Sequence, residues 1–166
     1  TKIKKDSFSE CESLITVVIP SSVKIIDNYA FSGCSSLKNI NIPSSITNIN
    51  NAAFSGCISL KNIIIPSCVK TISLEAFSHC SSLENIVIPD SVTSIGPWAF
   101  YQCKSLKSVT ISSSITTIEV ATFAKCNSLE TVLIPNSMTN IETDAFLSCN
   151  SKHFKLFITN ELKQTL

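Results

Sequence analysis

Residues 76–98 read AFSHCSSLENIVIPDSVTSIGPW, and the pattern within these 23 residues recurs along nearly the whole chain. Seven of the eight cysteines are spaced 23 residues apart, and each follows a phenylalanine by three residues (Phe8/Cys11, Phe31/Cys34, Phe54/Cys57, Phe77/Cys80, Phe100/Cys103, Phe123/Cys126 and Phe146/Cys149). The shared unit is A-F-x-x-C-x-S-L-x-x-I-x-I-P-x-S-V-x-x-I-x-x-x, in about six complete copies. The chain is therefore an array of one repeated element.

A fixed period of this length predicts a solenoid of stacked leucine-rich repeats, because one such unit cannot bury its own apolar residues. Within the unit, Ile86 and Ile88 alternate as on a strand, and Pro89 ends that strand. The S-V-x-x-I stretch predicts a second short extended segment, and A-F-x-x-C suits a single helical turn. We therefore expect a parallel β-sheet on the concave face, with short extended segments and single helical turns elsewhere.

The pattern covers residues 1–149 and then decays. Lys152 stands at the leucine position, and Leu156 and Ile158 are apolar one residue late. Residues 150–166 are expected to form either a degenerate last repeat, with a slipped strand, or a C-terminal cap. Thr1 begins in mid-unit without an N-terminal cap, so we interpret residues 1–149 as a fragment of a longer array.

The composition argues against several classes of function. The 166 residues carry 13 basic and 12 acidic side chains, and this balance does not suit a nucleic-acid-binding surface. Three glycines argue against a glycine-rich phosphate loop. No uninterrupted apolar run approaches the ~18 residues of a membrane span. We expect no nucleic-acid partner and no membrane span in this chain.

The cysteines raise the question of disulfides or metal binding. Metal-binding cysteines usually come in C-x-x-C pairs, which this sequence lacks. Parallel side chains on stacked coils also converge poorly for disulfides. We predict that the seven repeated cysteines are reduced, buried thiols that pack as small apolar residues. Cys68 replaces a serine of the repeat, and drift from serine is a simpler explanation than a reactive thiol.

A catalytic site would be expected to break the repeat in one concentrated patch, and no such patch occurs. His79 lies at a variable position of its unit, and His153 lies in the decayed tail. The acidic residues fall mostly at outward positions, which suits a solvated surface. We predict no catalytic residues, no metal site and no cofactor.

The outward residues of the predicted strands are the first candidate binding surface. One outward column is polar, whereas four of the six members of the next column are apolar (Val18, Asn41, Ile64, Val87, Thr110 and Leu133). An exposed apolar strip often marks a protein partner, although β-branched residues also stabilise strands without any partner. The candidate ligand-binding residues on this face are Asn39, Asn41, Asn62, Ile64, Asn85, Val87, Thr110 and Leu133.

Aromatic residues supply an alternative candidate patch, consisting of Tyr29, Trp98 and Tyr101. Trp98 and Tyr101 flank Ala99 and Phe100 at variable positions, and Tyr29 occupies the place of Trp98 in an earlier unit. Tryptophan and tyrosine are enriched at interface hot spots, and they also pack over neighbouring turns.

With these motifs in view, the chain resembles the BspA-like leucine-rich repeat family, whose unit carries I-x-I-P, V-x-x-I and A-F-x-x-C. One copy here consists of Ile86 to Pro89, then Val92 and Ile95, then Ala99, Phe100 and Cys103. Proteins that look like this occur on the surfaces of bacteria and of some parasitic protists, and they are associated with adhesion. The resemblance implies a non-enzymatic module that binds host matrix or cell-surface proteins. It also implies a cell-surface or secreted location.

Two alternatives remain beside adhesion: a structural spacer, and an intracellular, cytoplasmic scaffold for protein interactions. The absence of any N-x-S/T acceptor and the reduced thiols fit the cytoplasmic alternative. The chain also departs from the general leucine-rich repeat, which has Asn or Cys eight residues after its first leucine. Here that position holds Ser22, Ser45, Cys68, Ser91, Ser114 and Ser137, so another group must satisfy the backbone at that turn.

Overall fold

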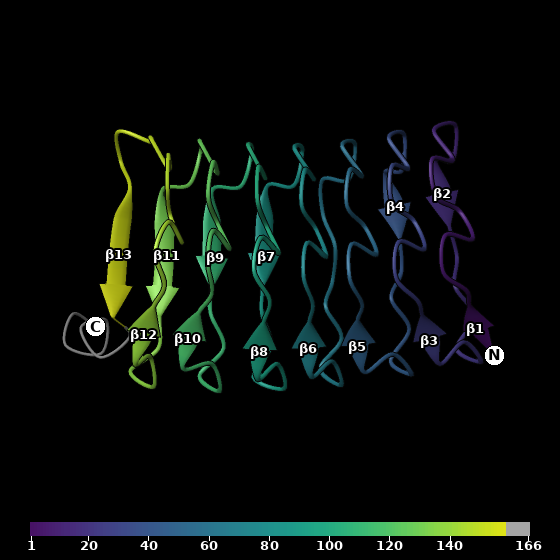
Figure 1. Cartoon of the computed structure of the whole chain (residues 1–166), viewed down its shortest axis with the longest axis horizontal. Coiled ribbons are helices and arrows are strands. Elements are labelled where there is room, and N and C mark those ends of the chain that lie inside the picture. Colours follow the sequence, from purple (N-terminus) through teal and green to yellow (C-terminus); the bar gives the residue numbers. More distant parts are fainter. Residues whose placement is uncertain (159–166) are drawn as a thin grey trace.

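The computed structural model describes residues 1–158, which form a parallel β-solenoid of stacked coils (Figure 1). Each coil passes through two strand positions. The first strand series comprises β2 (Thr16–Val17), β4 (Asn39–Ile40), β7 (Asn85–Val87), β9 (Ser108–Thr110), β11 (Thr131–Ile134) and β13 (Lys155–Ile158). The second strand series comprises β1 (Lys2–Ile3), β3 (Ile25–Ile26), β5 (Asn48–Ile49), β6 (Thr71–Ile72), β8 (Ser94–Ile95), β10 (Thr117–Ile118) and β12 (Asn140–Ile141). The predicted solenoid is confirmed.

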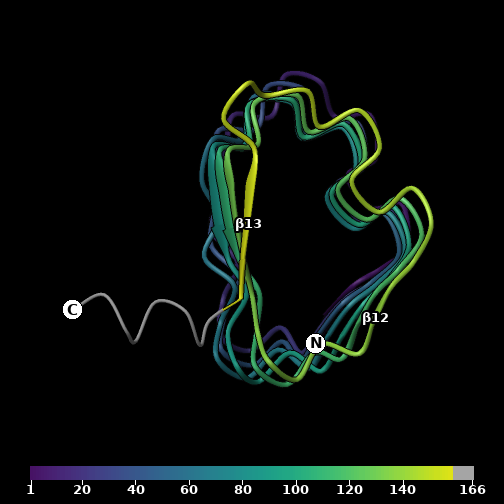
Figure 2. The same cartoon turned by 90° about the vertical axis from the view of Figure 1, so that its left-hand side faces the viewer.

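Strands pair in parallel with their equivalents in neighbouring coils. Thr71 of β6 lies between Asn48 of β5 and Ser94 of β8, so the register advances by one repeat per coil. Figure 2 looks along the solenoid and shows β13 and β12 on different sides of the coil. The turn segment, which carries A-F-x-x-C, forms the lobed remainder of the outline, and the apolar core fills the space inside.

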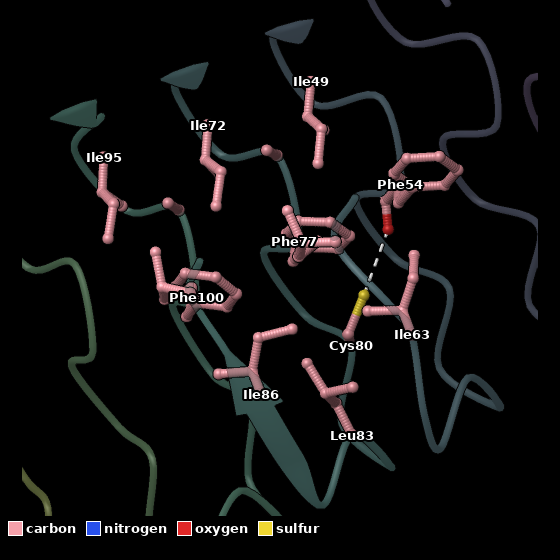
Figure 3. Packing of buried hydrophobic residues seen from close by; sticks show 14 of the residues in the cluster. Ile49, Phe54, Ile63, Ile72, Phe77, Cys80, Leu83, Ile86, Ile95 and Phe100 are labelled. Atoms are coloured by element: carbon pink, nitrogen blue, oxygen red, sulfur yellow. Dashed lines mark hydrogen bonds between the residues drawn. The ribbon is translucent and has the colours of Figure 1, made fainter. Parts of the chain in front are cut away.

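A column of stacked phenylalanines forms the centre of the core. The Phe77 ring centroid lies 5.5 Å from that of Phe54 and 5.4 Å from that of Phe100, with the ring planes within 9° of parallel (Figure 3). The stack runs from Phe8 to Phe146. Such aromatic pairs contribute about 0.5–1.5 kcal/mol each beyond the burial of their surface. The column therefore couples every coil to the next.

The A-F-x-x-C segment consists of consecutive β-turns, which corrects the prediction of a helical turn. Glu75 and His79 adopt φ angles of +56° and +60°, and a right-handed helix has no place for such residues. The Ser78 N–H closes a turn on Glu75 O (3.0 Å), whereas the His79 N–H donates to Tyr101 O of the next coil (2.7 Å). Because of the left-handed residues, every second N–H of this segment points along the solenoid axis and donates to the next coil, as at Glu75, Phe77 and His79.

The repeated cysteines add a further bond between coils. The Cys80 thiol donates to Phe54 O in the preceding coil at 3.2 Å (Figure 3). The same bond recurs at Cys34, Cys57, Cys103, Cys126 and Cys149. All eight cysteines are free, and five of the seven repeated ones are buried as predicted, whereas Cys11 and Cys149 in the end coils are only half-buried because a coil is missing on one side or slipped. Burial raises the pKa of the Cys80 thiol to about 12. These thiols are hydrogen-bond donors as well as apolar filling.

At the position eight residues after the leucine, where the general leucine-rich repeat has asparagine, Ser45, Cys68 and Ser137 supply a donor to the preceding coil. Ser91 Oγ at the same position is buried and has no hydrogen-bond partner within the described residues. Ser45 Oγ donates to Val23 O, and Ser137 Oγ donates to Ile115 O at 3.0 Å. Cys68 Sγ makes the equivalent bond to Ile46 O at 3.2 Å. Cys68 therefore makes the hydrogen bond that serine makes at this position in other coils. This supports the interpretation that Cys68 arose by drift from serine, and not the interpretation that it is a reactive thiol.

The last described strand is out of step with the repeat. Leu156 of β13 pairs with Val132 of β11, which is 24 residues earlier and not 23. Phe154 lies just before this strand and packs against Phe146 with a centroid distance of 5.8 Å. Residues 155–158 thus form a strand that pairs one residue out of the 23-residue register. Residues 159–166 lie outside the described residues.

Truncation of a central phenylalanine should destabilise the solenoid more than truncation in its first coil. Phe77 is fully buried, whereas Phe8 is 39% exposed. Phe77→Ala should lower the free energy of unfolding by about 3–5 kcal/mol, and Phe8→Ala by clearly less. Urea denaturation of both variants beside the parent measures the difference. Equal losses would contradict the stacked-coil packing.

A thiol-specific reagent checks the state of the cysteines. Five of them are buried in the native protein (Cys34, Cys57, Cys80, Cys103 and Cys126), so native protein should react slowly. After unfolding without reductant, all eight thiols should react. Fewer than eight reactive thiols would reveal disulfides and contradict the prediction that the repeated cysteines are reduced.

The raised thiol pKa values predict a loss of stability in alkaline solution. Burial raises the thiol pKa from 9.0 to about 11 at Cys34 and to about 12 at Cys80. A thiol whose pKa is higher in the folded than in the unfolded protein contributes its full stabilisation of the fold below pH 9. This contribution falls by about 1.4 kcal/mol per pH unit and per thiol as the pH rises toward the folded-state pKa.

The variant Cys80→Ser isolates one thiol, because serine keeps a donor for Phe54 O and does not titrate in this range. Its free energy of unfolding should fall less steeply than that of the parent between pH 9 and about 11. Denaturant titrations at several pH values in that window give both slopes. Identical slopes would mean that the buried Cys80 thiol does not resist ionisation.

Candidate functional site

The outward side chains of the first strand series form two parallel columns, which we call the first-strand face. Strand pairing places Asn85 opposite Ser108 and Val87 opposite Thr110, with Leu133 next along the same column. Toward the N-terminus, Asn39, Asn41, Asn62 and Ile64 line a common depression. The structure thus brings the predicted ligand-binding residues onto one face of the solenoid.

The apolar side chains of this column are exposed to solvent between Val18 and Val87. Val18, Ile64 and Val87 are 80%, 82% and 67% exposed, so none of them contributes to the core. Leu133 is half-buried, because its neighbour Phe157 in β13 extends the column beyond it. Phe157 is not predicted from the repeat, because the one-residue slip of β13 moves it out of the 23-residue register. A repeat pattern that allows a shift of one residue places Phe157 in this column.

The first-strand ladder is interrupted in the coil that carries Ile64. In the described part of the chain, β4 pairs only with β2, and no strand is assigned to residues 61–65. A surface depression of about 510 Å³ lies on one side of Ile64, between Val18 and Asn62. Another, of about 370 Å³, lies on its other side and extends to Val87 and Pro89. Ile64 is therefore an apolar ridge between two depressions.

The polar groups of the face differ in their availability. Asn41 uses both ends of its amide within the fold, accepting from Ile19 N–H (2.9 Å) and donating to Ile19 O (3.0 Å). Asn85 Oδ1 accepts from Ser108 Oγ at 3.0 Å. Within residues 1–158, the side chains of Asn39 and Asn62 make no hydrogen bond. These two exposed amides are the ones available to a ligand.

The face carries little charge. Neither outward column contains an ionisable residue between Thr16 and Leu133. The flanking column mixes both signs (Lys38, Lys61, Glu84, Lys107 and Glu130). Contact through this face would therefore depend on apolar surface and on neutral hydrogen bonds, which salt screens little.

The predicted aromatic patch divides into two places. Trp98 and Tyr101 line one depression on the turn segment, together with Glu75, Ser78 and His79. Tyr29 does not reach it and lies instead near Lys5, whose Nζ is 5.7 Å from the centroid of the tyrosine ring. The structure brings Trp98 and Tyr101 together and leaves Tyr29 apart.

Both histidines, His79 and His153, lie at the surface. His79 is exposed and makes an edge-to-face contact with Tyr101, with a centroid distance of 5.5 Å. Over residues 1–158, no three His, Cys, Asp or Glu side chains are arranged so that they could hold a metal ion. The same part of the chain has no helix with the length and apolar character needed to cross a membrane.

The sequence matches the BspA type leucine-rich repeat region, a family described by six copies of the repeat, over residues 1–95 and 47–165. The chain belongs to the BspA-type leucine-rich repeat family. A search of curated proteins found no match to this BspA-type array.

Solved structures show the same solenoid. A leucine-rich repeat protein from Bacteroides ovatus is 34% identical, with a TM-score of 0.88 over 95% of this chain and 40% of that chain. The leucine-rich repeat protein of T. pallidum is 28% identical, with a TM-score of 0.86 over 99% of this chain and 76% of that chain. The pneumococcal vaccine antigen PcpA shares the fold at 22% identity, with a TM-score of 0.65 over 91% of this chain and 39% of that chain. This BspA-type array thus spans 40% of the length of the Bacteroides ovatus protein.

Proposed function

We propose that this BspA-type array is a non-enzymatic module that binds a protein partner through its first-strand face, in adhesion at the cell surface. The observation that carries the proposal is the apolar column. Val18, Ile64 and Val87 are each at least 67% exposed, although the fold gives them nothing to pack against. Ile64 and Val87 are direct neighbours in this column, whereas Asn41 separates Ile64 from Val18. Exposed apolar side chains that gather on a protein surface often mark an interaction site.

The neighbourhood of Ile64 has the composition of an interface centre. The ridge offers an apolar contact, and the depressions on its two sides can receive side chains of a partner. The unused amides of Asn39 and Asn62 supply donors and acceptors at the edge. An apolar centre with polar groups around it is the usual anatomy of a protein interface. The complementary partner is a protein with an uncharged, apolar surface.

A location at the cell surface, or outside the cell, is supported by the family resemblance and is compatible with the thiols. Disulfide exchange and oxidation require the thiolate. Burial raises the pKa of the Cys80 thiol to about 12 and of Cys34 to about 11, so little thiolate exists at neutral pH. The buried thiols of Cys34 and Cys80 would therefore resist oxidation in an oxidising compartment. A cytoplasmic scaffold remains the alternative location.

A structural spacer is the second candidate function. The even register of β5, β6 and β8 and the unbroken phenylalanine stack favour a stiff rod that holds other segments apart. A spacer needs no exposed apolar column, which is why we rank it second.

The double variant Ile64→Asn/Val87→Thr tests the first-strand face with side chains that already occur at the same positions of other coils. Asn41 and Thr110 occupy the same positions in other coils, so the fold accepts both changes. The free energy of unfolding should change by no more than about 0.5 kcal/mol. Binding to immobilised extracellular matrix proteins should weaken by about tenfold or more, because these side chains form the exposed apolar contact. Added salt should matter little.

Ile25→Asn is the matched control, because Ile25 is an exposed apolar residue of the second strand series and Asn48 follows it in the next coil. The control should bind like the parent. If the parent binds no matrix protein, adhesion to matrix is wrong. If the double variant binds as the parent does, the first-strand face is not the interface, and the spacer becomes the better proposal.

A further inference from the structure

The depression beside Trp98 lies on the turn segment, away from the first-strand face. It measures about 290 Å³ and is lined by Glu75, Ser78, His79, Trp98 and Tyr101 from two neighbouring coils. The Trp98 ring is 39% exposed. Ala52 and Ala121 hold the same position in other coils, with the same left-handed backbone (φ +50° and +53°). The fold therefore does not need an indole at this place.

Ser78 gives the depression a buried polar floor. The residue is 2% exposed, lines the depression, and makes no side-chain hydrogen bond within residues 1–158. Its hydroxyl can both donate and accept a hydrogen bond, so it is the polar group that Ser78 offers to a ligand in the depression. Ala124 occupies this position two coils later, which shows that the turn itself does not depend on the hydroxyl.

The charges around the depression favour a neutral ligand. Lys125 Nζ already lies 5.3 Å from the centroid of the Tyr101 ring, and a hydrogen bond to Lys125 lowers the pKa of the Tyr101 hydroxyl. A cationic ligand would meet this ammonium, and an anionic ligand would meet the Glu75 carboxylate. The groups that remain useful are an aromatic face and several hydrogen-bonding atoms.

We propose that this depression binds one sugar ring of a glycan. A pyranose has an apolar face of C–H groups that can stack on the Trp98 indole, and hydroxyls at its edge. These hydroxyls can donate to the Glu75 carboxylate and exchange hydrogen bonds with Ser78 and His79. An aromatic wall with a few converging polar groups is the usual composition of a small-molecule site. The site is separate from the first-strand face, so it stands independently of the proposed protein binding.

Trp98 is the only tryptophan of the chain, so intrinsic tryptophan fluorescence reports on this depression alone. Titration of the full chain with glucose, galactose, mannose and N-acetylglucosamine should produce a saturable change with at least one of them. Glycerol, which has hydroxyls and no ring, should produce none. If no sugar gives a saturable change, the proposal is wrong.

The repeat supplies variants that the fold already accepts. Ser78→Ala copies Ala124 and Glu75→Ala copies Ala52, and both keep the fluorescent reporter. Each should weaken binding of the responding sugar by about tenfold. Trp98→Ala, which copies Ala121, should abolish binding measured by calorimetry. Tyr29→Ala removes an aromatic residue from the same column outside the depression and should leave sugar binding unchanged.

Three results would overturn the assignment. Tetramethylammonium could give a stronger response than every sugar, which would make the depression a cation site. Sugar binding could persist in both Ser78→Ala and Trp98→Ala, which would place it elsewhere. Trp98→Ala could weaken binding to a matrix protein while no sugar binds, which would make Trp98 an anchor for a protein partner.

Discussion

The fold depends on hydrogen bonds that run from coil to coil along the solenoid axis. Backbone N–H and C=O groups that are buried must be paired, and a single coil cannot pair its own. The turn segment solves this with residues in the left-handed conformation, so that the Phe77 N–H reaches Ala99 O at 2.8 Å and the His79 N–H reaches Tyr101 O. The thiol of Cys80 adds a side-chain bond in the same direction. Phenylalanine stacking then fills the core between coils that are already tied together.

This arrangement separates stability from recognition. The inward residues repeat because each must match the coil before and after it, whereas most outward residues are free of this constraint. Asn41 and Asn85, which bond to neighbouring coils, are exceptions. Apolar or aromatic side chains at outward positions, such as Ile64 and Trp98, therefore have no explanation in the packing of the core. Other coils show that asparagine or alanine serves there equally well. Both candidate sites lie at such positions.

The repeat predicts the solenoid, the phenylalanine stack and the free thiols, because each follows from the identity of inward residues at a fixed period. The turn geometry was not predicted, since a positive φ is uncommon in residues other than glycine, and Glu75 gives no hint of it. Gly33 and Gly56, at the position of His79 in two earlier coils, were the available signal. The interruption of the first-strand ladder at residues 61–65 cannot be predicted from the sequence, because residues 62–65 have the apolar pattern of a strand. The depression beside Trp98 requires Ser78 of the preceding coil, and only the turn geometry brings the two together.

Each candidate site is made by neighbouring coils and not by one coil. Trp98 stands over residues of the preceding turn segment, and Ile64 faces depressions shared with the coils that carry Asn41 and Val87. The order of coils therefore determines the sites, because exchanging two whole repeats would separate Trp98 from Ser78. In such an array, substitutions at outward positions that bond to no neighbouring coil, such as Ile64 and Trp98, can create or remove a site with little cost in stability, because the coil-to-coil hydrogen bonds of the backbone are kept.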